Sequence, residues 1–135
     1  MIKRFSRSMA VLGSALATLS PACAQTVSPM EKIHTSFTDK YVVQITIRNP
    51  YANGQLSEIE IYSEDWRPVR GAVLSHKSAY LGGGENLQVT ALVPFHPGRK
   101  TRYVYICHAI TPKSGGRGAA YRGEVCGKYS AIQLS

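Results

Sequence analysis

Apolar and polar residues alternate along several stretches of the chain. In residues 41–48 every second side chain, starting with Tyr41, is large and apolar, and in residues 56–62 Ile59 and Ile61 alternate with glutamates. Alternation with a period of two, rich in β-branched residues, is typical of a strand with one buried face. We therefore expect Ile59 and Ile61 to face a core and the neighbouring glutamates to face solvent.

The same pattern predicts seven short strands separated by turns. The predicted strands cover residues 34–38, 41–48, 56–62, 71–75, 87–93, 102–110 and about 121–134. Glycine, proline and asparagine mark the turns, as in Asn49-Pro50 and Gly82-Gly83-Gly84. No stretch has the period of an amphipathic helix of useful length. This pattern predicts an all-β, immunoglobulin-like two-sheet sandwich, with a barrel of five or six strands as the alternative.

Residues 63–70 interrupt the alternation. Asp65 and Pro68 favour a turn, and we expect Trp66, the only tryptophan, to fold back over the core. An exposed Trp66 would instead offer a stacking platform for a carbohydrate or another small ligand. A carbohydrate- or small-ligand-binding module is therefore one alternative function.

Cys107 and Cys126 are the only cysteines after residue 23. They fall on the last two predicted strands, where alternation places them on the face opposite Val104, Ile106 and Tyr129. We predict a disulfide that joins neighbouring strands of one sheet. The spacing lacks the C-x-x-C pattern of redox and metal sites, and closing a loop of about 20 residues contributes about 3 kcal/mol to stability.

The first 24 residues have the composition of a signal peptide. A basic start is followed by an apolar run over residues 9–19, too short to span a bilayer, and by small residues that end at Ala24. We expect cleavage after Ala24, which leaves one domain over residues 25–135. A true membrane anchor is a weaker alternative, and so is lipidation of Cys23, because Leu19 stands one position too far from it.

Export agrees with a disulfide, because the periplasm and the cell exterior are oxidising. Removal of the signal peptide lowers the net charge from +8 to +5. This mild surplus attracts anionic surfaces only weakly, and no cluster of lysine and arginine suggests nucleic acid. We expect a periplasmic or secreted protein without nucleic-acid partners and without a membrane span in the mature chain.

No set of residues in the sequence suggests catalysis. The histidines are scattered, without the spacing of a metal site; they are His34, His76, His96 and His108. There is no G-x-S-x-G motif, and Gly82-Gly83-Gly84 lacks the lysine that ends a phosphate-binding loop. We therefore expect no enzyme activity, no metal and no cofactor. A small hydrolase or an inhibitor is the least favoured alternative.

Aromatic and basic residues around the disulfide-closed loop suggest an interface, and the alternative is that they only cover the outer face of the sheet beside a solvated loop. Tyrosine and arginine are favoured where proteins meet. The candidate interface residues are Arg102, Tyr103, Tyr105, Arg117, Tyr121 and Arg122. An open edge of the sandwich would also allow a partner to add a strand. The sequence therefore predicts a protein partner in the cell envelope.

The strand that ends in Arg48-Asn49-Pro50 resembles a strand of the N-terminal domain of periplasmic pilus chaperones. The corner at residues 63–66 and the Gly84-Glu85 turn fit the same scheme. The last hairpin, residues 101–134, looks like the closing strands of a fibronectin type III domain. The resemblance covers most of the mature chain and implies an immunoglobulin-like fold. Export, the small size, the β pattern and the absence of a catalytic set favour a role through protein–protein contacts, in an envelope or surface assembly such as a pilus or secretion system.

Two features depart from the pilus-chaperone pattern. Those chaperones resemble two such domains in tandem, whereas residues 25–135 have room for one. The basic pair that anchors the C-terminal carboxylate of a pilus subunit cannot be placed on this sequence, so no site residue is carried over. A shared fold alone does not define a function.

Overall fold

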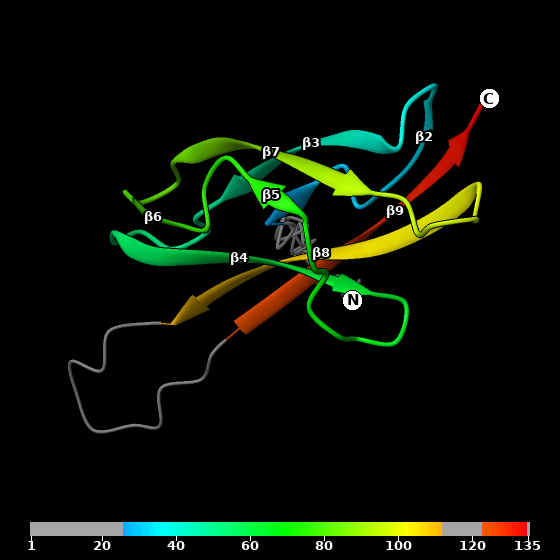
Figure 1. The fold of residues 1–135 in the computed structure, drawn as a ribbon. Helices are drawn as coiled ribbons and strands as arrows, with labels where there is room; N and C mark the ends of the chain where they lie inside the picture. The colour runs from blue at the N-terminus through cyan, green and yellow to red at the C-terminus, as the bar shows by residue number, and fades with distance from the viewer. Residues whose placement is uncertain (1–25, 112–122, 135) are drawn as a thin grey trace, which may run out of the picture.

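The computed structural model describes residues 26–111 and 123–134, and these residues form nine strands (Figure 1). The strands are β1 (Val27–Ser28), β2 (Glu31–Ser36), β3 (Lys40–Arg48), β4 (Gln55–Ser63), β5 (Val73–Leu74), β6 (Ser78–Leu81), β7 (Asn86–Pro94), β8 (Thr101–Thr111) and β9 (Gly123–Gln133). The described part of the chain contains no helix that could cross a membrane.

The strands form two sheets that pack face to face (Figure 1). One sheet has the order β1-β3-β7-β5, and the other has the order β2-β9-β8-β4-β6. Paired strands are antiparallel except for β2 and β9, which run parallel with Ile33 opposite Ser130. The fold is therefore the predicted immunoglobulin-like sandwich and not a barrel.

The chain changes sheet close to the start of the described part. β1 pairs with β3 in the four-stranded sheet, and after Pro29 the chain enters β2, which pairs with β9 in the five-stranded sheet. The Ser28–Pro29 peptide bond is cis. Each of the first two strands thus covers a different edge of the sandwich.

Two of the nine strands, β1 and β6, are absent from the predicted set. β1 has only two residues, and β6 lies at a sheet edge where Leu81 alone is fully buried. Neither segment shows the alternation on which the prediction depends. β2 also begins at Glu31, before the predicted start at His34. Its first residues are exposed, and they belong to the strand because their backbone pairs with β9.

Alternation sets the core as predicted. Every second residue of β3 is buried, and Ile59 and Ile61 of β4 join the same core while the glutamates beside them point outward. On the last hairpin, Val104 and Tyr129 are fully buried. Burial of one large aliphatic side chain contributes about 1.5–3 kcal/mol, so the core fixes which face of each sheet points outward.

Asn49 joins two turns at one end of the sandwich. Its buried side-chain Nδ2 donates to the carbonyls of Leu81 and Gly82 at 3.0 Å each, and to that of Asn53 at 2.8 Å. Its Oδ1 accepts from the Tyr51 N–H at 3.0 Å. The asparagine after β3 therefore satisfies buried backbone groups of two loops at once.

Candidate functional site

β4 ends in a tight turn that carries Trp66. The Ser63 N–H donates to the Arg67 carbonyl at 2.8 Å, and the Trp66 N–H donates to the Ser63 carbonyl at 2.9 Å. Trp66 has a φ of 59°, the left-handed conformation that is uncommon for residues other than glycine. The turn directs the indole to the outside, where Trp66 is 55% exposed. The prediction that Trp66 covers the core is therefore wrong, because this turn closes on the outer side of the sheet.

Four aromatic side chains gather on the outer face of the five-stranded sheet. We call Tyr62, Trp66, Tyr103 and Tyr105 the aromatic cluster. The rings of Trp66 and Tyr105 stack with centroids 4.2 Å apart and planes 5° apart. Tyr103 meets Tyr105 edge-on at 5.8 Å, and Tyr62 is tilted against Trp66 at 6.1 Å. Each such pair contributes about 0.5–1.5 kcal/mol beyond its buried area, so the rings hold one another in place.

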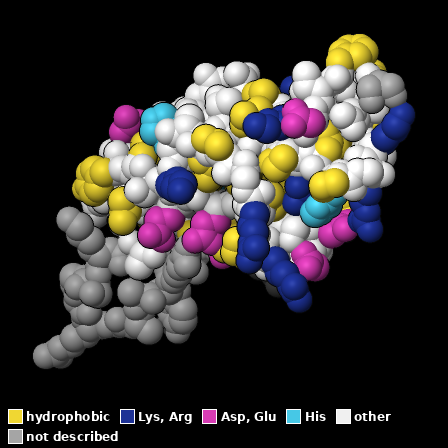
Figure 2. Space-filling model, in the orientation of Figure 1, with side chains coloured by type: hydrophobic (Ala, Val, Ile, Leu, Met, Phe, Trp, Pro, Cys, Tyr) yellow, Lys and Arg dark blue, Asp and Glu magenta, His cyan; other side chains and the backbone are white. Residues whose placement is uncertain are grey.

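Acidic side chains border the aromatic cluster. Glu60 lies two residues before Tyr62 on β4, and its carboxylate accepts a hydrogen bond from the Tyr62 hydroxyl. Glu58 and Glu124 both stand opposite Ala109, one on each side of β8. Figure 2 shows acidic side chains gathered along β4. The outer face thus combines one exposed indole and three half-buried phenol rings with carboxylates.

Lys128 is the one basic side chain on this outer face among the strand residues that the structure describes. Its Nζ lies 4.5 Å from the centre of the Tyr103 ring, a cation–π contact. The register places Glu31 of β2 opposite Lys128. An ammonium group is therefore already seated against one ring of the aromatic cluster.

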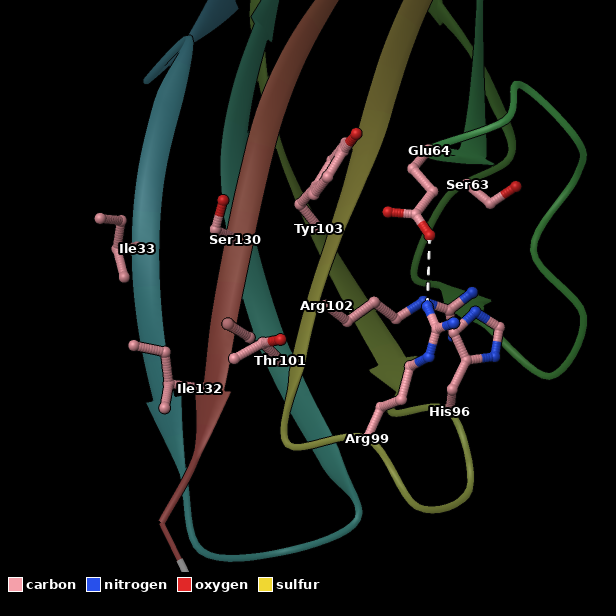
Figure 3. Close-up of a pocket in the computed structure, with 11 residues that line it drawn as sticks. Ile33, Ser63, Glu64, His96, Arg99, Thr101, Arg102, Tyr103, Ser130 and Ile132 are labelled. Atoms are coloured by element: carbon pink, nitrogen blue, oxygen red, sulfur yellow. Dashed lines mark ion pairs between the residues drawn. The ribbon is translucent and has the colours of Figure 1, made fainter.

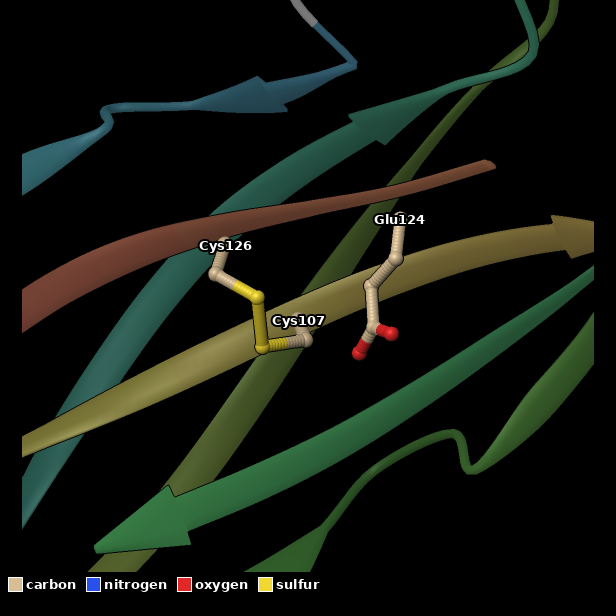
Figure 4. Close-up of side chains that lie close together, drawn as sticks. All are labelled: Cys107, Glu124 and Cys126. Atoms are coloured by element: carbon tan, nitrogen blue, oxygen red, sulfur yellow. A yellow bond between two sulfur atoms is a disulfide. The ribbon is translucent and has the colours of Figure 1, made fainter. Parts of the chain in front are cut away.

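Cys107 and Cys126 form the predicted disulfide across the last hairpin (Figure 4). The two residues are directly opposite in the register of β8 and β9, within one sheet and on its outer face. The Glu124 carboxylate lies within 4.8 Å of both sulfur atoms. These three side chains do not make a metal site, because the two sulfur atoms are bonded to each other and are not thiolates.

The predicted interface residues do not all lie together. Tyr103 and Tyr105 are half-buried members of the aromatic cluster. Arg102 points to the opposite face of the sheet, where its Nη1 donates to the Pro94 carbonyl at 2.5 Å. The remaining three residues, Arg117, Tyr121 and Arg122, lie outside the described residues.

A hollow of about 520 Å³ lies where β2, β9 and β8 meet the loop before β8 (Figure 3). Arg99 and Glu64 form an ion pair at 3.6 Å, with Arg102 and His96 beside it. Ile132 lies on the far side of the hollow. Sequence reasoning misses this hollow, because strands and loops far apart in the chain form its walls.

Histidines do not converge on a site in the described part of the chain, where none belongs to a group of three metal-ligating side chains. His108 is buried, and burial lowers its pKa. The nearby backbone of Thr26 raises this pKa by a smaller amount, although neither ring nitrogen makes a hydrogen bond of regular geometry. The pKa of His34 is lowered by burial and then by the positive charge of Lys32. Both rings are therefore neutral at neutral pH and belong to the packing of the sandwich.

These features define an immunoglobulin-like domain. Two sheets pack face to face, the first two strands belong to different sheets, and a disulfide joins the two strands of the last hairpin. Solved structures of pilus chaperones have the same fold. The structure of the Salmonella enterica SafA pilin in complex with the SafB chaperone matches with a TM-score of 0.65 and 15% identity, over 79% of this chain and 53% of that chain. The E. coli chaperone DraB matches with a TM-score of 0.62 and 16% identity, over the same shares.

A third structure extends the comparison to a chaperone with a different partner. The CsuC–CsuE chaperone–tip adhesion subunit complex of Acinetobacter baumannii matches with a TM-score of 0.59 and 11% identity, over 79% of this chain and 55% of that chain. The chain thus spans about half the length of these structures. No family model and no curated protein sequence matches it. The predicted resemblance to pilus-chaperone domains is confirmed for the fold.

Proposed function

We propose that this protein is exported and binds a protein partner in the cell envelope, as an accessory or structural component of a pilus- or secretion-related assembly. The fold match to pilus chaperones, over 79% to 81% of the chain, is the observation that carries this proposal. Two of the matched structures are chaperones in complex with a pilin and with a tip adhesion subunit. The disulfide also suits an oxidising compartment.

The proposed interface centres on Tyr103 and Tyr105 and extends along the last hairpin. Half-buried aromatic rings that support one another are typical of the central contacts of protein interfaces. Arg102 points away from this interface, and the remaining candidate interface residues, Arg117, Tyr121 and Arg122, lie beyond the described part of the chain. We infer that the protein acts by binding and not by catalysis, as the chaperones it resembles do.

Site-specific crosslinking in the native envelope tests this proposal. A photoreactive amino acid replaces Tyr103 in one variant and Val42 in a matched control, since Val42 is 49% exposed on the outer face of the other sheet. We expect one recurring envelope protein to crosslink to the Tyr103 variant only. Equal yields from both positions, or no envelope protein from either, would contradict the proposal.

Export is tested by recovering the protein from cell fractions and measuring its intact mass. We expect the periplasmic or secreted fraction to contain a chain that begins at Gln25 and carries one disulfide. A full-length chain in the cytoplasm with free thiols would argue against export. A mass that includes an acylated Cys23 would support lipidation instead.

A carbohydrate- or small-ligand-binding function is the second candidate, favoured by the exposure of Trp66. The indole is 55% exposed, although one of its faces stacks on Tyr105, so its remaining exposed surface is the platform that a sugar ring could contact. A glycan array with the mature protein tests this function. Saturable binding that is lost in Trp66→Ala would support it, and the absence of any bound glycan would dismiss it.

A further inference from the structure

The outer face of the five-stranded sheet differs in charge from the chain as a whole. The sequence contains 16 basic and 8 acidic residues, for a net charge of +8. The strand register nevertheless places four carboxylates and one ammonium group on this face, from Glu31, Glu58, Glu60, Glu124 and Lys128. Half of the acidic residues therefore lie on one face of a basic protein.

Three of these carboxylates surround a flat centre made of small side chains. Glu58 and Glu124 stand on either side of Ala109, and Glu60 stands beside Cys107. Ala109 and Cys107 are only 2% and 1% exposed, so neighbouring side chains already cover them, and the Glu124 carboxylate lies within 4.8 Å of the Cys107 sulfur. Because neighbouring strands are about 4.8 Å apart, Glu58 and Glu124 begin roughly 10 Å from each other. A lysine or arginine side chain can lie over carboxylates at this spacing.

The aromatic cluster continues the same surface. Trp66 stacks on Tyr105 and remains 55% exposed. Aromatic faces attract ammonium and guanidinium groups through the ring quadrupole. The contact of Lys128 with Tyr103, at 4.5 Å, is an example within the molecule itself. Rings and carboxylates side by side attract cations by two mechanisms at once.

We propose that this face docks a lysine- or arginine-containing segment of a protein partner. The basic side chains lie between Glu58, Glu60 and Glu124, and the stem of the segment lies against Trp66 and Tyr105. The identification of that partner as an envelope protein rests on the proposed function, but the docking chemistry does not. This choice of occupant follows from charge complementarity between the face and a cationic peptide.

The overall positive charge of the protein disfavours the binding of a basic peptide, so such binding is a stringent test of the proposal. The mature chain keeps a net charge of +5, which weakly favours acidic partners by long-range attraction. Preference for a basic peptide over an acidic one therefore reports a local acidic surface and not the average field. The preference weakens at high salt, because exposed charges are screened.

Trp66 provides the signal for a direct test, since it is the only tryptophan in the sequence. The purified, oxidised mature chain is titrated with a peptide that alternates lysine and arginine with glycine, and with a glutamate–glycine peptide of equal length. We expect a saturable change in tryptophan fluorescence with the basic peptide only. A neutral oligosaccharide forms a third arm, since a glycan is the competing occupant.

Two matched variants locate the binding. Glu60→Gln keeps an acceptor for the Tyr62 hydroxyl and removes one charge from the face, whereas Asp39→Asn removes one charge from an exposed loop elsewhere. We expect Glu60→Gln to weaken peptide binding by about fivefold and Asp39→Asn to leave it unchanged. Urea unfolding of both variants confirms that each is folded as the parent is.

Three outcomes would overturn the docking proposal: equal binding of both peptides, equal effects of both variants, or a response to the oligosaccharide alone. The proposed envelope function fails separately. Crosslinking without an envelope partner, combined with basic-peptide binding in vitro, removes the function and keeps the docking face. Crosslinking to an envelope partner, combined with no preference for the basic peptide in vitro, removes the docking face and keeps the function.

Discussion

Tyr41 and Tyr129 are both fully buried, but their hydroxyl groups differ. The Tyr129 hydroxyl donates to the Pro29 carbonyl at 2.5 Å, whereas the Tyr41 hydroxyl has no hydrogen-bond partner within the described residues. Burial raises the pKa of each phenol to about 12, with Arg102 partly opposing this for Tyr41. Both hydroxyls therefore keep their protons at neutral pH, and only one of them is satisfied.

Removing each hydroxyl in turn measures this difference. Tyr129→Phe should lower the free energy of unfolding by about 1–1.5 kcal/mol, because the Pro29 carbonyl loses its donor. Tyr41→Phe should be neutral or stabilising, because it removes a buried polar atom that makes no hydrogen bond. Urea unfolding of both variants measures the two values. Equal losses in the two variants would contradict this reading of the core.

At the scale of elements, loops and strands are joined by a few contacts that the core does not supply. Asn49 links the turn after β3 to the turn before β7. The disulfide links β8 to β9 on the face away from the core. Each of these contacts lies in a different part of the sandwich, so their effects on stability should add.

Asn49→Ala should destabilise the protein by about 2 kcal/mol. The substitution leaves buried carbonyls, including that of Leu81, without a donor. Asn53→Ala is the matched control: Asn53 is exposed and takes part through its backbone carbonyl, so its cost should stay within about 0.5 kcal/mol. Thermal or urea unfolding measures both. A loss at position 53 as large as at position 49 would show that the loop conformation, and not the Asn49 side chain, matters.

Loss of the disulfide should cost about 3 kcal/mol, as expected for cysteines separated by 19 positions. The double variant Cys107→Ala, Cys126→Ala should unfold at lower urea than the oxidised parent. Reductant should lower the midpoint of the parent and leave that of the double variant unchanged. Coincident midpoints for the oxidised and reduced parent would mean that strand pairing alone holds the hairpin.

At the scale of the whole molecule, buried histidines link stability to pH. His108 is fully buried and its ring nitrogens have no hydrogen-bond partner in the described part of the chain, so burial lowers its pKa in the folded state. In the unfolded chain the ring binds a proton below about pH 6.5. The unfolded state therefore binds more protons in acid. The free energy of unfolding falls below about pH 6.5 and levels off below the folded-state pKa.

His108→Leu should remove part of this acid-side loss. Urea unfolding at about pH 7.5 and about pH 5 gives the change in stability for the parent and for each variant. His76→Gln, at an exposed position, should keep the loss of the parent. The change contributed by one histidine is limited to about 1.4 kcal/mol per pH unit. An identical pH dependence in parent and His108→Leu would exclude His108 as its source.

The fold was predictable where alternation is complete. β3 alternates buried and exposed residues throughout, and the placement of Ile59, Ile61 and Val104 in the core is confirmed. The disulfide was predictable because strand parity alone fixes the face on which each cysteine lies. β1 and the extra length of β2 were not predictable, because edge pairing satisfies backbone groups whatever the side chains are.

The sequence by itself determined the strands with regular alternation, the faces of the last hairpin and the cysteine pairing, because these depend on local periodicity and on residues close in the chain. Tertiary structure alone decided the surface that we propose as functional. Trp66 itself has a left-handed backbone conformation in its turn, and its ring lies on Tyr105 and not in the core as expected. Strand order then brought Glu58 and Glu124, far apart in sequence, to either side of Ala109. No local pattern encodes such a meeting, since it depends on which strands pair.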